Sequence, residues 1–263
     1  MPDPVESVLV EDLVGVVLAA GEGVRLRPLT LRRPKPLCPV DNVPLVDHAL
    51  RRAATVTPHL AVNLHHGRDQ LAAHLEAEAG PVAGSPVHLS VEEPEALGTA
   101  GALGQLRPWI DGRPAVVLNG DTWSPGTLAG AVQGWDRERV RLLVVDDDRL
   151  TRSSRLAGAL LPWSEIALLE AVPSGLYEAS WGRLAAEGRI EVVRWDGPWV
   201  DCGTPARYLH ANMLASGGRS VVGPGSKVDG RVVRSVLWED SVVRADEVLV
   251  DAVRAGNLTV LVR

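Results

Sequence analysis

The stretch LAAGEGVRLRPLTLRRPKPLCPV, residues 18–40, comes directly after a short apolar run, Leu13 to Leu18. An apolar run of this length that ends in a glycine-rich turn predicts a buried β-strand followed by a loop. Such loops in open α/β sheets bind phosphate groups, because backbone amides can approach an anion closely where no Cβ intervenes. The stretch therefore predicts an α/β fold with a phosphate-binding loop after its first strand.

The spacing of the glycines excludes two common phosphate-binding motifs. The dinucleotide fingerprint requires Gly-x-Gly-x-x-Gly, and the chain has Gly21 and Gly23 but Leu26 at the third position. A P-loop requires Gly-Lys-Ser or Gly-Lys-Thr at its end, which the stretch lacks. An NAD-linked oxidoreductase is disfavoured further, because no acidic residue follows at a convincing distance to bind the ribose.

Lys35 is the second notable feature of this stretch. It lies between Pro34 and Pro36, and a residue before proline is biased toward extended backbone, so the ammonium is predicted to project from a stiff, extended ribbon. Lys and Arg together number 27, and only Lys35 and Lys227 are lysine. Because arginine carries almost every other positive charge, a lysine here favours a role for a compact point charge; placement by chance is the alternative.

The same stretch resembles the signature of the sugar-1-phosphate nucleotidyltransferases, also called NDP-sugar pyrophosphorylases. That signature is L-A-A-G-x-G-x-R-[LM]-x-P-L-T followed by P-K-P, and the chain matches it at Leu18, Ala19, Ala20, Gly21, Gly23, Arg25, Leu26, Pro28, Leu29, Thr30, Pro34, Lys35 and Pro36. The resemblance implies a Rossmann-like, mixed but mostly parallel sheet flanked by helices. It also implies transfer of a nucleotidyl group from a nucleoside triphosphate (NTP) to a sugar 1-phosphate, with release of pyrophosphate.

Site residues in this stretch follow from the resemblance. Catalysis is assigned to Arg25 and Lys35, and nucleotide binding to Leu18, Ala19, Ala20, Gly21 and Gly23. Residues 97–102, LGTAGA, resemble the base-recognition turn of the family, so Gly98 and Thr99 are expected to bind the nucleotide as well. Thr99 is also predicted to be the N-cap of the helix that follows.

Two aspartates are the expected ligands of Mg²⁺. Asp121, in the sequence Asn-Gly-Asp, follows a short buried strand, where a carboxylate can hold Mg²⁺ against nucleotide phosphates. Asp201, in Trp-Val-Asp-Cys-Gly-Thr-Pro, resembles the second metal ligand of the family. The two residues are distant in the sequence, so they can meet only through the fold. Thr204 and Pro205 are expected as the N-cap and first residue of a helix.

The sugar-binding region departs from the family pattern. Many relatives carry a Glu-Lys-Pro segment before the glycine that contacts the sugar; Gly158 stands at the place of that glycine, but Glu-Lys-Pro is missing. Glu178 is the candidate replacement, an acid that binds a sugar hydroxyl, and an ordinary helix-surface glutamate is the alternative. The sequence therefore leaves the sugar open.

Within the family, the LGTAGA turn, the sequence Asn-Gly-Asp-Thr-Trp and the ending Val-Asp-Cys-Gly-Thr-Pro most resemble the mannose-1-phosphate guanylyltransferase and N-acetylmuramate-1-phosphate uridylyltransferase types. The expected substrates are GTP with a mannose- or heptose-type 1-phosphate, or UTP with an N-acetylhexosamine-type 1-phosphate. Thymidylyltransferases more often have Leu-Ala-Gln at the base-recognition turn. From a different class, a non-catalytic, sugar-nucleotide-binding regulatory subunit of the same fold is the alternative, although such relatives often lose the lysine or a metal aspartate.

Three other polar groups are expected to be structural. The acids at 146–148 run into an arginine-rich segment and predict a solvated loop. His65 and His66 have no third metal ligand nearby in the sequence, which favours packing at the end of the sheet. Cys38 and Cys202 lack a CxxC partner, so we expect buried, unreactive thiols.

Composition excludes several classes of protein. The net charge of −6 argues against a general nucleic-acid-binding protein, whose surface would be basic. No apolar run reaches membrane-spanning length, and the acidic N-terminus lacks the basic and apolar parts of a signal peptide. A soluble, cytoplasmic protein without membrane partners is expected.

The order of elements predicts a catalytic domain over 8–216 and a β appendage over 219–263. Strands are expected at 13–18, 60–64, 87–91, 115–118, 140–145, 156–161 and, at an edge, 190–195; helices are expected at 44–56, 69–79, from 98 onward, at 125–135, over most of 162–188 and at 206–215. From residue 221 onward, Val and Gly recur at about six-residue intervals, which resembles a left-handed β-helix. Such a short β-helix would be a cap or an arm for homo-oligomerisation; a pair of edge hairpins is the alternative.

Overall fold

The computed structural model describes residues 9–77, 82, 86–145 and 150–262. The chain forms two compact units, which are described one at a time. Unit 1 comprises Met1–Gly21, Asp47–Gly120 and Ser124–Trp199, and unit 2 comprises Glu22–Val46, Asp121–Trp123 and Val200–Arg263. The stretch 18–40 thus contributes to both units, and the division into contiguous domains at 8–216 and 219–263 stays a prediction.

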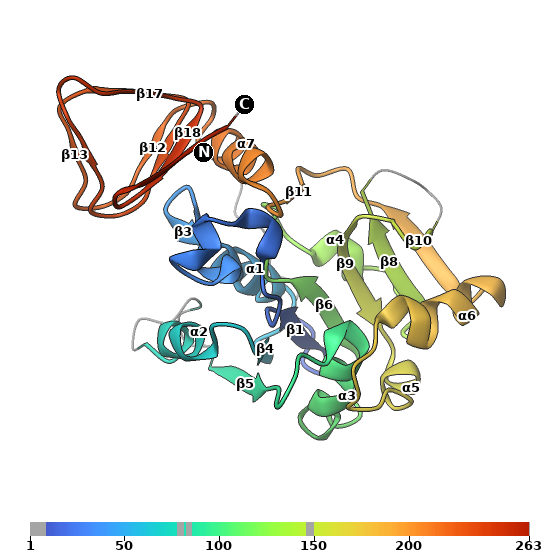
Figure 1. Cartoon of the computed structure of the whole chain (residues 1–263). Coiled ribbons are helices and arrows are strands. Elements are labelled where there is room, and N and C mark those ends of the chain that lie inside the picture. The colour runs from blue at the N-terminus through green and yellow to red at the C-terminus, as the bar shows by residue number, and fades with distance from the viewer. Residues whose placement is uncertain (1–8, 78–81, 83–85, 146–149, 263) are drawn as a thin grey trace. The chain divides into compact units, whose positions relative to one another are not determined.

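Unit 1 is built on a seven-stranded sheet with the order β10-β8-β9-β6-β1-β4-β5 (Figure 1). Its strands are β1 (Val14–Leu18), β4 (Leu60–Leu64), β5 (Val87–Val91), β6 (Ala115–Asn119), β8 (Val140–Val144), β9 (Leu156–Leu161) and β10 (Ile190–Arg194). Neighbouring strands are parallel, except that β9 runs antiparallel to both β6 and β8. The mostly parallel, mixed sheet predicted from the sequence is confirmed, with β10 at an edge as expected.

The helices of unit 1 follow the predicted order but are shorter. They are α1 (Leu45–Ala53, in unit 1 from Asp47), α2 (Arg68–Leu75), α3 (Gly98–Ile110), α4 (Ala129–Val132), α5 (Trp163–Ile166), a π-helical turn (Tyr177–Trp181) and α6 (Gly182–Ala186). The prediction of a mostly helical segment over 162–188 is wrong for 167–175, which forms a loop against α3. At 125–135 only α4 is helical.

Close packing of α3 explains why this helix contains glycines. A Cβ placed on Gly104 would lie 2.3 Å from both the carbonyl carbon and the oxygen of Glu170, and one on Gly101 would lie 2.3 Å from the Val172 oxygen. The loop after α5 therefore runs directly against the backbone of α3. On the helix face toward the sheet, Leu103 and Leu106 join the fully buried core with Val14 of β1.

Gly104→Ala is expected to lower the free energy of unfolding by about 1–3 kcal/mol, because the methyl group has no room beside Glu170. In an open helix the same change would raise stability by roughly 1 kcal/mol, so the sign of the effect reports the contact. Gly130→Ala in α4 is the control, since a Cβ there would meet nothing within 4 Å. Urea unfolding followed by tryptophan fluorescence measures both variants; equal stability of the two would contradict the packing argument.

Unit 2 begins with three short 3-10 turns and a small hairpin. The turns are Val24–Leu26, Leu29–Leu31 and Lys35–Leu37, and the hairpin joins β2 (Pro39–Val40) to β3 (Val43–Pro44). Two further short strands, β7 (Thr122–Trp123) and β11 (Val200–Asp201), pair antiparallel. Helix α7 (Pro205–Ala215) follows, and the hydroxyl of Thr204 accepts a hydrogen bond from the Arg207 amide, so the predicted N-cap is confirmed.

The C-terminal part of unit 2 coils into a three-sided prism (Figure 1). Its strands are β12 (Val221–Val222), β13 (Lys227–Val228), β14 (Arg231–Val233), β15 (Val236–Leu237), β16 (Val242–Val243), β17 (Val248–Val250), β18 (Ala252–Ala255) and β19 (Leu258–Leu261). Parallel pairs form each face, β12-β15-β18, β13-β16 and β14-β17, and β19 closes the first face antiparallel. The expected β-helix is confirmed, since edge hairpins would pair antiparallel throughout.

Residue spacing in the coil explains this shape. Small and apolar side chains such as Leu237, Val243 and Leu249 point inward and are buried, whereas Val242 and Val248 face outward.

In the described parts of the chain, no helix is both long and apolar enough to cross a membrane.

Candidate active site

Lys35 lies at the centre of a charged cluster in unit 2. Only 5% of its side chain is exposed, and its Nζ donates hydrogen bonds to Oδ2 of Asp121 at 2.7 Å and to Oδ1 of Asp201 at 3.3 Å. The two aspartates come together because Thr122 and Asp201 are register partners in the β7-β11 pair. The prediction that Asp121 and Asp201 meet through the fold is confirmed.

The backbone around Lys35 differs from the extended ribbon predicted from the two prolines. Residues Lys35–Leu37 form a 3-10 turn, in which the Leu37 amide donates to the Pro34 carbonyl at 2.9 Å and the Cys38 amide donates to the Lys35 carbonyl at 3.0 Å. The bias of a residue before proline toward extended backbone is a preference, and these two hydrogen bonds outweigh it. The lysine is nevertheless held stiffly, because both ends of the turn are bonded.

Two glycines make room for the cluster. Gly23 has φ of 69°, in the left-handed region, and a Cβ on it would lie 2.9 Å from Cβ of Lys35. A Cβ on Gly203 would lie 2.9 Å from Oδ1 of Asp201 and 3.0 Å from Nη2 of Arg25. Gly23 therefore serves the packing of the lysine, a role that the motif alone does not reveal.

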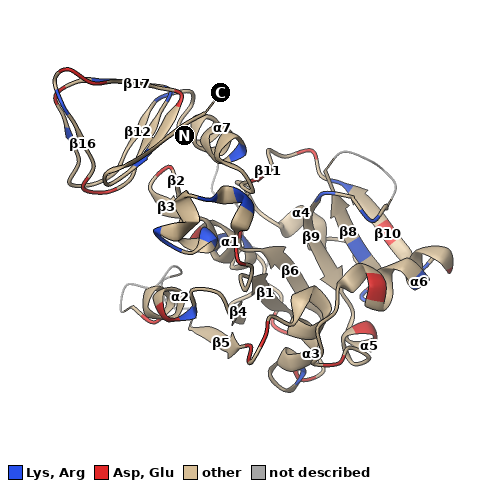
Figure 2. Cartoon of the chain, in the orientation of Figure 1, with Lys and Arg blue, Asp and Glu red and all other residues tan. Residues whose placement is uncertain are grey.

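Two exposed arginines complete the cluster on Asp201. Nη2 of Arg25 lies 3.7 Å from Oδ2 of Asp201, and Nη1 of Arg207 lies 3.0 Å from the same oxygen. Figure 2 shows further basic residues on the segment before β2. Sequence reasoning missed Arg207; the signal was available, because it occupies the first turn of the helix that follows Asp201.

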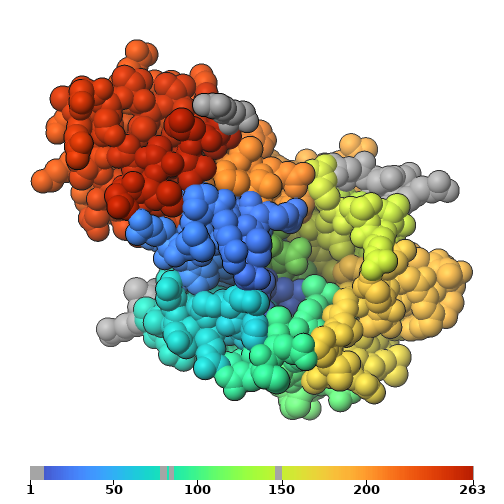
Figure 3. Space-filling view, viewed as in Figure 1, coloured from blue at the N-terminus to red at the C-terminus, as the bar shows by residue number. Residues whose placement is uncertain are grey.

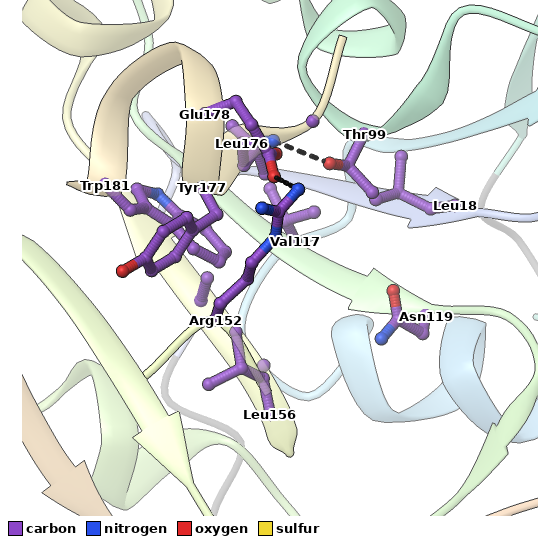
Figure 4. A pocket seen from close by; sticks show the side chains of 13 residues that line it. Leu18, Thr99, Val117, Asn119, Arg152, Leu156, Leu176, Tyr177, Glu178 and Trp181 are labelled. Carbon is purple, nitrogen blue, oxygen red and sulfur yellow. Dashed lines mark hydrogen bonds and ion pairs between the residues drawn. The ribbon is translucent and has the colours of Figure 1, made fainter. Parts of the chain in front are cut away.

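Unit 1 contains a pocket of about 250 Å³ at the carboxyl ends of β1 and β6, in the hollow seen between α3 and the residues that follow β9 (Figure 3). Four predicted site residues line it: Leu18, Thr99, Gly158 and Glu178. The other lining residues include Asn119, Arg152, Tyr177 and Trp181 (Figure 4). Apolar walls with a few polar groups are typical of pockets for small ligands.

Thr99 is not the N-cap of α3, so that prediction is wrong. The helix begins one residue earlier, at Gly98, and is preceded by Leu97. The Thr99 hydroxyl instead accepts a hydrogen bond from the Leu176 amide at 2.8 Å (Figure 4). Gly98 has φ of 70°, and a Cβ there would lie 2.6 Å from the Ser174 oxygen. The start of the helix is thus in contact with Leu176 and the 167–175 loop, a contact that cannot be seen in the sequence.

Glu178 forms an ion pair at the pocket and lies close to Gly175. Its Oε1 lies 2.7 Å from Nη2 of Arg152 (Figure 4). A Cβ on Gly175 would lie 2.4 Å from its Oε2, so only glycine fits there without moving the carboxylate.

Gly158 lies in β9, and a Cβ on it would lie 2.8 Å from Cδ2 of Leu118. The acids at 146–148, predicted as a solvated loop, lie outside the described residues.

The ends of β1 and β4 are joined by side-chain contacts to the backbone. Oδ1 of Asn63 accepts a hydrogen bond from the Ala19 amide at 2.7 Å, and Nδ1 of His66 lies 3.0 Å from the Ala20 carbonyl. Nδ1 of His65 lies 2.9 Å from the Glu92 carbonyl. Both imidazoles thus contact backbone carbonyls at this end of the sheet. Among the residues described, no group of three or more His, Cys, Asp or Glu could hold a metal.

Both cysteines are buried, as predicted. Burial raises the pKa of the Cys38 thiol to about 12 and raises the pKa of the Cys202 thiol as well. The thiolate, which is the reactive form, is therefore scarce at neutral pH.

Native protein is expected to resist alkylation by iodoacetamide at pH 8, because both thiols are protonated and shielded. Denaturation in urea should expose both thiols and accelerate labelling by about a hundredfold or more, since the ordinary thiol pKa is about 8.5. Mass spectrometry of timed samples measures the two rates. Rapid labelling of either cysteine in the native protein would contradict the buried assignment.

Comparison with known proteins agrees with this fold. A family model described as nucleotidyl transferase matches residues 14–149. The N-acetylmuramate α-1-phosphate uridylyltransferase of Caulobacter vibrioides is 30% identical over 230 residues, which cover 75% of this chain and 95% of that protein. The mannose-1-phosphate guanylyltransferase of Mycobacterium tuberculosis is 38% identical over 120 residues, which cover 43% of this chain and 31% of that protein.

Solved structures show the same fold. HddC from Yersinia pseudotuberculosis aligns with a TM-score of 0.61 at 18% identity, over 77% of this chain and 99% of that chain. The family model covers more than half of the sequence, and the Caulobacter relative is matched over nearly its whole length. The chain therefore belongs to the nucleotidyl transferase family, and its resemblance to the sugar-1-phosphate nucleotidyltransferases is confirmed.

Proposed function

We propose that this enzyme transfers a nucleotidyl group from an NTP to a sugar 1-phosphate and releases pyrophosphate. The observation that supports the proposal most strongly is the cluster around Lys35, a buried ammonium between Asp121 and Asp201 with Arg25 and Arg207 beside it. Phosphoryl-group chemistry requires positioning and charge neutralisation more than covalent help from the protein. Three cations and two carboxylates in one place suit a polyphosphate that arrives with a divalent cation.

The residues of this cluster fit Mg²⁺. Oxygens of Asp121 and Asp201 already converge on one cation, the ammonium of Lys35. Mg²⁺ is commonly bound by one or two carboxylates, with substrate phosphates and water as the other ligands, so a larger set of protein ligands is not needed. We assign Asp121 and Asp201 as the metal ligands; when bound, Mg²⁺ would neutralise charge on the phosphates.

Removal of divalent cations is expected to abolish turnover. EDTA in excess over added Mg²⁺ should lower pyrophosphate release at least a hundredfold, because two carboxylates without a metal repel the triphosphate. Readdition of Mg²⁺ should restore the rate. Release that continues unchanged in EDTA would rule out the metal assignment.

The bond changes follow from the substrates. A phosphate oxygen of the sugar 1-phosphate attacks the α-phosphorus of the NTP, and a new P–O bond forms. The bond between the α-phosphorus and the bridging oxygen breaks, and its electron pair leaves with pyrophosphate. Lys35 places its charge against the α-phosphate and the sugar phosphate as negative charge develops. Arg25, with the amides of Gly21 and Gly23, binds the leaving pyrophosphate.

The residues of unit 1 are assigned to the nucleoside and the sugar. Leu18, Ala19, Ala20 and Gly21, with Gly98 and Thr99, bind the nucleotide, and Gly158 and Glu178 bind the sugar. The pocket supports these assignments, because it contains Leu18 and Thr99 together with Gly158 and Glu178. Among its walls, Tyr177 offers an aromatic ring and the Arg152–Glu178 pair offers both hydrogen-bond donors and acceptors (Figure 4).

Two substrate pairs are proposed. GTP with a mannose- or heptose-type 1-phosphate is supported by the mycobacterial relative, which is named for guanylyl transfer to mannose 1-phosphate. UTP with an N-acetylhexosamine-type 1-phosphate is supported by the Caulobacter relative, named for uridylyl transfer to N-acetylmuramate 1-phosphate.

A matrix of reactions tests the function. The protein is incubated with Mg²⁺, each of four NTPs and a set of sugar 1-phosphates, and pyrophosphate release is measured for every pair. Release with one pair, at least about tenfold above the others, identifies the substrates. Absence of release with every pair would reject catalysis on these substrates.

A further inference from the structure

Glu92 is a fully buried carboxylate between the two turns assigned to nucleotide binding. It follows β5, in the acidic segment before α3 (Figure 2), and its relative exposure is 0%. Its Oε1 accepts a hydrogen bond from Nδ2 of Asn63 at 2.7 Å, and its Oε2 accepts one from the Leu97 amide at 2.7 Å. Asn63 in turn accepts from the Ala19 amide at 2.7 Å. A continuous chain of three hydrogen bonds therefore joins Ala19 to Leu97.

The two ends of this chain determine its chemistry. Both ends are backbone N–H groups, which can only donate. The amide of Asn63 accepts from Ala19 with its oxygen and donates with its nitrogen, so the next group must accept at both of its atoms. Of the side chains of this length, only an ionised glutamate accepts twice. A glutamine in place of Glu92 would put its NH₂ against either the Leu97 amide or the Asn63 amide.

We propose that Glu92 is a positioning residue for the nucleotide: it holds the Ala19 and Leu97 backbones, and so the turns at Leu18–Gly21 and Gly98–Thr99, at a constant separation. This inference rests on the proposed function, which assigns both turns to the NTP. A buried carboxylate is costly unless hydrogen bonds satisfy it. The positioning role explains its presence here, because one oxygen accepts from the Leu97 amide and the other accepts from Asn63, which in turn accepts from the Ala19 amide.

Glu92→Gln is the first test, because it changes one atom and keeps the shape. We expect the Kd of the NTP, measured by calorimetry with whichever of GTP and UTP the wild type binds more tightly, to rise about tenfold to a hundredfold. The kcat at saturating NTP should stay within about threefold of wild type, since none of the residues assigned to catalysis belongs to the hydrogen-bond chain. A general loss of folding would lower the measured kcat as well, so a raised Kd with a nearly unchanged kcat distinguishes the positioning role from misfolding.

Asn63→Asp combined with Glu92→Gln is the decisive variant. The introduced aspartate would accept from the Ala19 amide and from the side-chain amide of the introduced glutamine. The oxygen of that glutamine would accept from Leu97, so every donor again meets an acceptor at unchanged net charge. We expect the double variant to bind the NTP within about threefold of wild type, although Asn63→Asp alone places two carboxylates together and weakens binding at least tenfold. Glu95→Gln, an exposed carboxylate of the same segment, is the matched control and should bind as wild type.

Each outcome decides the inference. Equal NTP affinity in wild type and Glu92→Gln overturns it, and so does a folded double variant that stays at least tenfold weaker than wild type. If Glu92→Gln is unfolded by circular dichroism, the double variant decides: recovery of folding and affinity supports the positioning role, and failure to recover either contradicts it. If wild type binds neither GTP nor UTP, the proposed function itself fails, which is a different result from loss of binding in the variant alone.

Discussion

Lys35→Ala is expected to lower kcat by about a hundredfold or more while the protein stays folded. Loss of one preorganised positive donor at developing charge typically costs about 3 to 4 kcal/mol of transition-state stabilisation. The structure supports a large effect, because the Lys35 ammonium is buried, is paired with Asp121 and Asp201, and projects from a hydrogen-bonded 3-10 turn. A mobile cation from the solvent would not be held at the same place. Steady-state pyrophosphate release with the substrate pair found in the reaction matrix measures the change.

The chain offers a natural control for this variant. Lys227, the other lysine, is exposed on β13, and Lys227→Ala should leave kcat within about twofold of wild type. Lys35→Arg keeps the charge but replaces a compact ammonium by a larger fork in a buried position, so less than a tenth of the lost rate should return. Near-normal turnover of Lys35→Ala, with an unchanged circular dichroism spectrum, would refute the catalytic role.

Asp121→Asn is expected to lower kcat/KM by about a hundredfold or more. The substitution removes one of two carboxylates assigned to Mg²⁺, and such a metal supplies several kcal/mol of charge stabilisation. In the structure Asp121 contacts Lys35, and 41% of its side chain is exposed, so an amide of the same shape should disturb the fold little. When the rate is measured against Mg²⁺ concentration, half-saturation should require at least about tenfold more Mg²⁺ than in wild type.

Direct metal binding separates this explanation from loss of the ion pair with Lys35. Electron paramagnetic resonance of free Mn²⁺, in the presence of a non-hydrolysable NTP analogue, should show that Asp121→Asn raises the Kd of Mn²⁺ at least tenfold. Asp229→Asn, at an exposed position on the β-helix, is the control and should match wild type. Unchanged Mn²⁺ affinity in Asp121→Asn would remove Asp121 from the metal site, whatever the effect on rate.

Local sequence predicted the structure correctly where the interactions that form an element lie within a few residues of one another. The strands at 60–64, 87–91 and 156–161 match their predicted bounds, because short apolar runs bounded by turn residues leave few alternatives. Thr204 caps α7 as predicted, since a Thr-Pro pair supplies both the acceptor and the preset first residue. The β-helix was also predictable, because its coil repeats in the sequence.

Predictions from local sequence were wrong where contact with a distant segment determines the local structure. Thr99 does not cap α3, because its hydroxyl accepts from the Leu176 amide and the 167–175 loop packs on Gly98. The same segment was predicted to be helical, yet its backbone runs as a loop in close contact with the glycines of α3. Nothing within either segment indicates the other, so propensity alone could not have found the contact.

Sequence motifs were enough to identify the family, the strands of the large sheet, and the types of residue that phosphate chemistry needs, among them Lys35, Asp121 and Asp201. The contacts among these residues follow from the fold: the β7-β11 pairing brings both aspartates to one ammonium, and Arg207 joins them from the first turn of α7. Tertiary structure alone also revealed the chain from Ala19 through Asn63 to Glu92 and Leu97. The physical reason is range: strand and helix signals act over a few residues, whereas hydrogen bonds and ion pairs act over about 3 Å between residues that only the folded chain brings together.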